Sequence, residues 1–156
     1  MVRYREFQFS WLITIVLLPF QGWLVYSYLN NLGNRPMPLE IFLILTGLFV
    51  LIYLTFYGMT TSINSEKIII SFGIGLFRKR INLGRIAKVD TSRSPWYYGY
   101  GIRLIPNGWM YNVSGPHSVE LTFTDRDRII RIGTQDPQRL KQEIDSRLNR
   151  EVHVHN

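Results

Sequence analysis

Five basic side chains close together in the sequence are the residues most able to bind a charged ligand. They are Arg78, Lys79, Arg80, Arg85 and Lys88. Guanidinium and ammonium groups attract phosphates, so this set suits an anionic lipid headgroup or a nucleic acid. A basic residue held near an anionic leaflet contributes about 1 kcal/mol to membrane binding. Three interpretations stay open: general attraction to a leaflet, a strand face solvated by water, and a specific headgroup pocket.

Acidic residues and histidines do not form a recognisable catalytic or metal-binding pattern. Asp125 and Asp127, with Glu120, could serve general acid–base catalysis, but two aspartates around a turn usually serve turn geometry. The chain has no cysteine, and its histidines are His117, His153 and His155. The last two lie in the C-terminal tail without a third ligand at a suitable spacing. We therefore expect no catalytic residue, no metal site and no cofactor.

An aromatic segment follows the basic residues. It contains Trp96, Tyr97, Tyr98 and Tyr100, and Trp109 comes shortly after it. Rings with a polar tip are typical of partner contacts and of membrane interfaces. Aromatic side chains also fill β-cores and pair across strands, and this alternative stays open. We treat these five residues as candidate partner contacts.

Two apolar segments, 11–29 and 39–57, must position these groups. Each is 19 residues long, and neither contains Lys or Arg. A helix rises ~1.5 Å per residue and needs about 20 apolar residues to cross a hydrocarbon core of roughly 30 Å. The sequence therefore predicts two transmembrane helices, 11–29 and 39–57, that form a hairpin within residues 1–58.

The distribution of basic residues predicts the orientation of this hairpin. Arg3 and Arg5 precede the first apolar segment, the basic set follows the second, and the connecting loop 30–38 carries only Arg35. Cytoplasmic flanks of transmembrane helices are enriched in Lys and Arg. We therefore expect an integral membrane protein with both termini in the cytoplasm and the connecting loop outside.

One polar side chain, Gln21, lies near the middle of the first apolar segment. Pairing across an antiparallel hairpin with this loop places it opposite Thr46 and Gly47. A small residue permits close approach, and an amide in lipid seeks a partner on the facing helix. We expect a helix–helix contact here. The alternative, a transport or quinone site, lacks any ionisable neighbour.

After residue 58 the sequence changes to short strands separated by turn residues. The expected strands are 60–64, 67–72, 76–83, 86–91, 102–106, 109–113, 119–124 and 128–132. Asn107-Gly108 predicts a two-residue type I′ hairpin. A helix over 136–150 is predicted from the Asp136 cap and a stripe of Leu140, Ile144 and Leu148, with a flexible tail at 151–156.

The strand 76–83 shows a clear alternation of side chains. Phe77, Lys79, Ile81 and Leu83 lie on one side, and Arg78, Arg80 and Asn82 lie on the other. One face is therefore expected to be buried and the other basic and wet. Lys79 is the exception on the apolar side.

Residues 60–148 resemble the bacterial pleckstrin-homology-like (PH-like) domains of small membrane proteins with paired transmembrane helices. The matching motifs are Ile68-Ile69-Ile70-x-Phe72-Gly73, the basic strand Arg78-Lys79-Arg80, Ile81-x-Leu83-x-x-Ile86-x-x-Val89, and Asp136-Pro137 at the start of the striped helix. The resemblance implies a membrane α+β protein, located in the bacterial inner (cytoplasmic) membrane. In it, the transmembrane hairpin precedes a PH-like antiparallel β-barrel or sandwich at 60–150, with a C-terminal capping helix.

The resemblance also implies a binding or assembly domain and names no ligand. The net charge is +7, and the part from residue 60 onward holds 15 basic and 9 acidic residues, or +6. We expect a non-catalytic module for protein–protein interaction or assembly at the cytoplasmic face, with another membrane protein or its own copies as partner. The alternative is a sensor of anionic lipid headgroups. Tethering to a bilayer favours lipid over nucleic acid, and an enzyme or transporter is less favoured.

Overall fold

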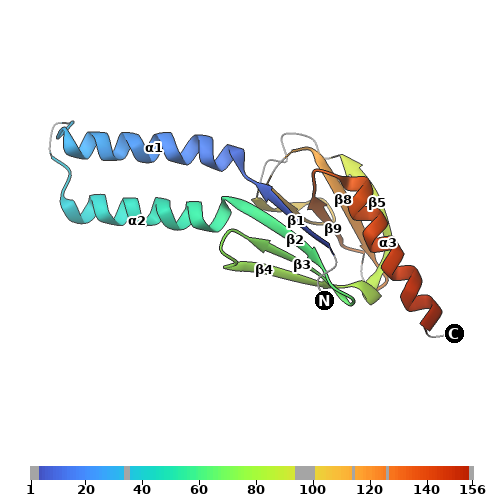
Figure 1. The fold of residues 1–156 in the computed structure, drawn as a ribbon. Helices are drawn as coiled ribbons and strands as arrows, with labels where there is room; N and C mark the ends of the chain where they lie inside the picture. The colour runs from blue at the N-terminus through green and yellow to red at the C-terminus, as the bar shows by residue number, and fades with distance from the viewer. Residues whose placement is uncertain (1–3, 34–35, 94–100, 114, 126, 155–156) are drawn as a thin grey trace.

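Two apolar helices project side by side from a β-rich region in this computed structural model, which describes residues 4–33, 36–93, 101–113, 115–125 and 127–154 (Figure 1). The helices are α1 (Trp11–Leu29) and α2 (Leu39–Phe56). Only 6% of the 18-residue apolar window of each is buried, so the rest of the chain does not cover their surfaces. Both are long and apolar enough to span a membrane, which suggests membrane association.

The first sheet contains a strand from before the helices. Its strands, in spatial order, are β1 (Tyr4–Phe9), β2 (Gly58–Ile63), β3 (Lys67–Phe72) and β4 (Phe77–Asn82), and all neighbours are antiparallel. Phe9 pairs with Gly58, and the Ser10 N–H donates to the Tyr57 carbonyl oxygen at 2.8 Å. The helical hairpin is therefore an insertion between two paired strands.

The sequence pattern does not predict a strand at residues 4–9, because the side chains on the inward face of this segment are polar. Tyr4 and Gln8 are buried on that face, whereas Phe7 is exposed on the other. Gln8 Nε2 donates to the Gly133 carbonyl oxygen at 2.7 Å, and Glu6 accepts from Thr134 Oγ1 at 2.8 Å. These hydrogen bonds tie β1 to the second sheet and satisfy the buried polar groups.

The second sheet is mixed and has the order β5-β8-β9-β7-β6. Its strands are β5 (Ile86–Arg93), β6 (Gly101–Ile105), β7 (Gly108–Asn112), β8 (His117–Phe123) and β9 (Ile129–Gly133). The prediction of an entirely antiparallel domain is wrong, because β7 and β9 are parallel. The chain reverses between β7 and β8 and again between β8 and β9, so β9 runs in the direction of β7. The described strands form two sheets and not a closed barrel.

The β6–β7 hairpin turns one residue earlier than predicted. Ile105 pairs with Gly108, so Pro106 and Asn107 form the loop, and Asn107 has φ +69°. A type I′ turn needs positive φ at both central positions, which the proline ring forbids. Proline followed by a residue with positive φ is instead the pattern of a type II turn.

The core lies between the sheets and under the C-terminal helix α3 (Pro137–Val154), which packs on β5, β8 and the short 3₁₀ turn η1 (Leu83–Arg85). The predicted stripe is confirmed: Leu140 and Ile144 are fully buried and Leu148 is partly buried. Asp136 Oδ1 accepts from the Arg139 N–H at 3.0 Å, as expected for a cap. The helix continues to Val154, four residues beyond the predicted end, because no Gly or Pro stops it.

Candidate functional site

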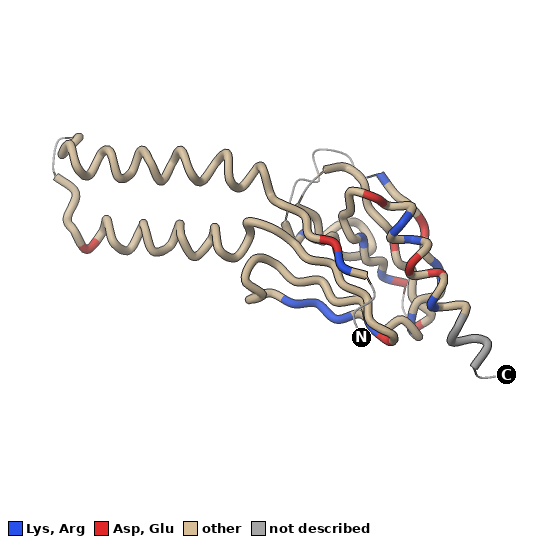
Figure 2. Tube along the Cα trace, viewed as in Figure 1, with Lys and Arg blue, Asp and Glu red and all other residues tan. Residues whose placement is uncertain are grey.

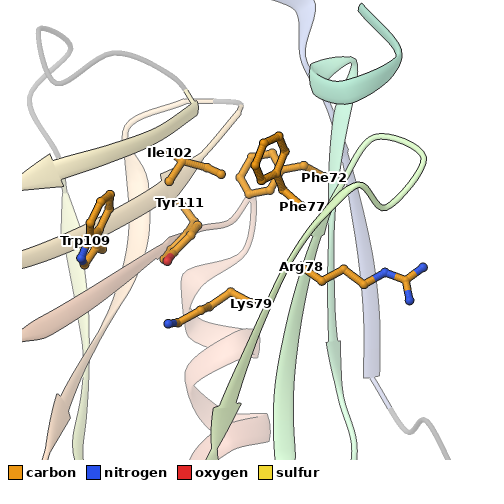
Figure 3. A pocket seen from close by; sticks show the side chains of 7 residues that line it. All are labelled: Phe72, Phe77, Arg78, Lys79, Ile102, Trp109 and Tyr111. Atoms are coloured by element: carbon orange, nitrogen blue, oxygen red, sulfur yellow. The ribbon is translucent and has the colours of Figure 1, made fainter. Parts of the chain in front are cut away.

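A cleft of about 380 Å³ opens between the two sheets (Figure 3). Its lining comes from β3 and β4 of the first sheet and from β6 and β7 of the second. The lining residues are Phe72, Phe77, Arg78, Lys79, Ile102, Trp109 and Tyr111. Most are apolar or aromatic, which is the usual lining of a ligand pocket. We refer to this site as the inter-sheet cleft.

The cleft exists because this side of the sheets is not closed. Strand β4 is the last strand of the first sheet, and β6 is the last strand of the second, among the strands that the structure describes. On the opposite side, the bonds of Gln8 and Glu6 join the sheets. Trp109 is 41% exposed and Phe77 is 51% exposed, so both rings remain accessible.

Lys79 is the charged group that points into the inter-sheet cleft. Figure 3 shows its ammonium group directed toward the side that carries Trp109 and Tyr111, whereas Arg78 points away. The alternation of side chains along β4 explains this difference. Lys79 is the one basic residue on the apolar side of the predicted strand 76–83. In the structure, it places a positive charge in a mostly apolar cleft.

The other predicted basic residues are in different surroundings. Arg85 forms an ion pair with Asp125, and Lys88 Nζ lies 2.7 Å from Asp90 Oδ2. The hydrogen bond to Asp90 raises the pKa of Lys88 above its ordinary value. Arg78, Lys79 and Arg80 are exposed on β4 (Figure 2), and no ion pair to them is present within the described part of the chain. The five residues therefore divide into an unpaired strand segment and two ion-paired residues.

A second cavity, of about 570 Å³, connects this region with the helix ends. It is lined by Ile13 of α1, Phe56 of α2 and residues 101–104 of β6. Ile102 lines both cavities. The ring of Phe56 also lies 6.1 Å from that of Phe77, centroid to centroid. The inter-sheet cleft is therefore next to the end of the apolar hairpin. No pattern in the sequence marks Ile102 as a site residue.

The predicted aromatic contacts are only partly described. Trp96, Tyr97, Tyr98 and Tyr100 lie outside the described residues. Trp109 belongs to the cleft, on the strand face that it shares with Tyr111. The alternation of side chains along 109–113 predicts this shared face from the sequence, but it does not show that β4 lies opposite.

Two of the three acidic residues considered for catalysis form ion pairs. Asp125 pairs with Arg85, and Glu120 Oε2 lies 2.7 Å from Arg131 Nε. Within residues 4–33, 36–93, 101–113, 115–125 and 127–154, no group of three or more His, Asp or Glu residues could hold a metal ion. The chemistry that the inter-sheet cleft offers is the binding of an apolar ligand with a negative group.

Inside the apolar hairpin, Gln21 Nε2 donates to Thr46 Oγ1 at 3.2 Å. Gly47 does not provide the expected close approach, because a Cβ built on it meets nothing within 4 Å. The hydrogen bond, and not a small residue, therefore joins the helices at this level.

We expect Gln21→Leu and Thr46→Val each to weaken the helix pair, with a coupling of about 0.6 kcal/mol, a typical value for interhelical hydrogen bonds in membranes. Unfolding in detergent micelles of the wild type, both single variants and the double variant gives this coupling. Strictly additive effects would contradict a contribution from the hydrogen bond.

Comparisons of the chain with protein-family models, with curated proteins and with solved structures find no match. The chemistry of the inter-sheet cleft is therefore the basis for assigning a function.

Proposed function

We propose that this protein is a non-catalytic binding module, anchored in the bacterial inner membrane, that holds a segment of a protein partner in the inter-sheet cleft. The partner segment is apolar and carries one acidic residue. The observation that supports this proposal is the ammonium group of Lys79, which is directed into a cleft whose lining is mostly apolar and aromatic. In this proposal the β region is a PH-like domain on the cytoplasmic side.

The strands beside the cleft favour an extended polypeptide as the ligand. Edge strands present backbone N–H and C=O groups, which an added strand can pair with. β4 and β6 are both edge strands of the described sheets. Aromatic residues such as Trp109 and Tyr111 frequently provide the main contacts in protein interfaces. A segment that enters between β4 and β6 would meet all of these groups.

The anchor increases the chance of meeting such a partner. α1 follows directly from β1, and α2 leads directly into β2, so two covalent connections hold the domain at the membrane. Confinement of the cleft and of a membrane-bound partner to one leaflet raises their effective concentration. The basic residues 78–80 of β4 and the two arginines that precede α1 in the sequence support an orientation with both termini in the cytoplasm.

We expect Lys79→Glu to lower partner binding about tenfold or more, because charge-assisted hydrogen bonds contribute about 1.5–3 kcal/mol. A photo-crosslinking amino acid in place of Trp109, used in native membranes, measures this as the yield of the protein adduct. Arg80→Glu is the matched control, since it makes the same charge change on the other face of β4. A crosslinker in place of Gln142, exposed on α3, gives the background.

Equal losses in the Lys79→Glu and Arg80→Glu variants would indicate general electrostatic attraction and contradict a site in the cleft.

A second candidate function is the binding of anionic lipid headgroups. The absence of ion pairs to Arg78, Lys79 and Arg80 in the described structure favours it. The same crosslinking experiment separates the two functions. A lipid adduct at Trp109 that disappears in Lys79→Glu would support headgroup binding, and a protein adduct would support the first proposal.

A further inference from the structure

We infer that the turn between β3 and β4, residues 73–76, inserts into the lipid leaflet beside the end of α2. This inference rests on the membrane anchoring proposed above and not on the ligand of the cleft. It adds a third membrane contact to those of the two helices.

The turn is attached to α2 by a backbone hydrogen bond. The Ile74 N–H donates to the Leu54 carbonyl oxygen at 3.1 Å. Gly73 has φ +49°, and a Cβ built on it would collide with the carbonyl oxygens of Leu54 and Thr55. A glycine therefore allows the backbone of the turn to lie directly against the last turn of the helix.

The level of this contact along α2 sets the depth of the turn. Leu54 lies two residues before the end of the helix at Phe56, or about 3 Å along the axis. The 18 residues of α2 extend about 27 Å, slightly less than the roughly 30 Å hydrocarbon core. Nearly the whole helix is therefore needed to cross the membrane once. The Leu54 carbonyl, and Ile74 with it, then lie at the edge of the hydrocarbon core.

The side chains of the turn are apolar and exposed. Ile74 and Leu76 are each 58% exposed, whereas the ring of the next residue, Phe77, lines the inter-sheet cleft. Two large apolar side chains exposed together on one short turn mark a contact surface. The surface continues that of α2, whose Leu54 is also exposed. A lipid leaflet is the occupant that this continuity favours, because the same leaflet surrounds the helix.

The charge next to the turn also fits a leaflet. Arg78 lies two residues after the turn, and a Cβ built on Gly75 would lie 2.8 Å from its Nη2, so the guanidinium lies beside the turn. Figure 2 shows the basic residues of β4 beginning beside the turn and continuing away from the helices. An apolar tip followed by basic residues matches the order of acyl chains and phosphates in an anionic leaflet.

Spin labels at single cysteines test this inference, since the natural chain has none. The full chain is reconstituted in vesicles of phosphatidylcholine and phosphatidylglycerol, with one label at Leu76→Cys, Ile44→Cys or Ser146→Cys. Collision rates with oxygen, which concentrates in lipid, and with a water-soluble nickel chelate report the surroundings. We expect the oxygen-to-nickel ratio at position 76 to exceed that at 146, on α3, several-fold.

The label at position 44, exposed on α2, separates the possible failures. A high ratio at 44 with a ratio at 76 equal to that at 146 would overturn the inference while the anchoring stands. A low ratio at 44 would overturn both. Low collision rates at 76 with both reagents would show that protein, such as a second copy, covers the turn, which also overturns the inference.

Discussion

A chain in which Asn-Gly replaces residues 11–56 should fold in water, whereas a chain that begins at Gly58 should not. In the structure, Ser10 and Tyr57 are hydrogen-bonded neighbours, so a two-residue hairpin loop can join β1 to β2. The joined chain keeps the buried Gln8 and the Glu6 carboxylate in place. The shortened chain loses both, together with every hydrogen bond between β1 and β2.

The expected difference is large compared with the stability of a small domain. Loss of Gln8 leaves the Gly133 carbonyl without its side-chain donor, and an unsatisfied buried group costs about 1–3 kcal/mol. Loss of Glu6 removes the acceptor of Thr134 and of the Gln135 N–H. With the missing strand, this is a large part of the 5–15 kcal/mol that typically stabilises a domain.

Circular dichroism and thermal unfolding of both chains measure this difference. A third chain, the joined form with Gln8→Ala, should unfold cooperatively at a lower temperature than the joined form. Cooperative folding of the shortened chain with the stability of the joined form would show that β1 is not part of the domain.

Gly73→Ala should destabilise the full chain by about 2–5 kcal/mol, the sum of left-handed backbone strain and of overpacking. Gly73 has φ +49°. The added methyl group would meet backbone atoms of Leu54 and Thr55, which cannot rotate away as a side chain can. The turn must then leave α2, so the oxygen-to-nickel ratio of a label at position 76 should fall.

Gly115→Ala is the matched control for this substitution. Gly115 also has a positive φ, +99°, but its Cβ would meet nothing within 4 Å. Gly115→Ala should therefore lower the free energy of unfolding only by the strain of a positive φ, because its methyl group meets no atom. The oxygen-to-nickel ratio of a label at position 76 should not change. Similar losses in both variants, measured by unfolding in detergent micelles, would show that contact between the turn and α2 contributes little.

The insertion of the helices between β1 and β2 has a consequence for binding. Because paired strands enter the two helices, tilting of the hairpin would pull on the sheet that carries Lys79. Phe56 at the end of α2 also contacts Phe72 and Phe77 of the inter-sheet cleft, and the turn at residues 73–76 is hydrogen-bonded to the same end of α2 through Ile74 and Leu54. In the proposed function, these contacts hold the cleft in one orientation relative to the leaflet.

Local patterns in the sequence were sufficient for much of this fold. Two long apolar segments without Lys or Arg predicted α1 and α2 to within one residue at each end. Alternation and turn residues located β3 with its correct bounds, and the Asp136 cap with its apolar stripe located α3. Each of these signals lies within a few residues along the chain. The physical cause is equally local, being helix length, side-chain period or capping.

Only the tertiary structure showed that residues 4–9 form a strand, that Pro106–Asn107 is the turn, and that Lys79 faces Trp109 across a cleft. The inward side chains of β1 are polar, so their burial depends on partners more than 120 residues away, such as Gly133. Lys79 and Trp109 likewise meet because two sheets come together. Periodicity shows which side of a strand a residue occupies, but the packing of distant segments decides what lies opposite it.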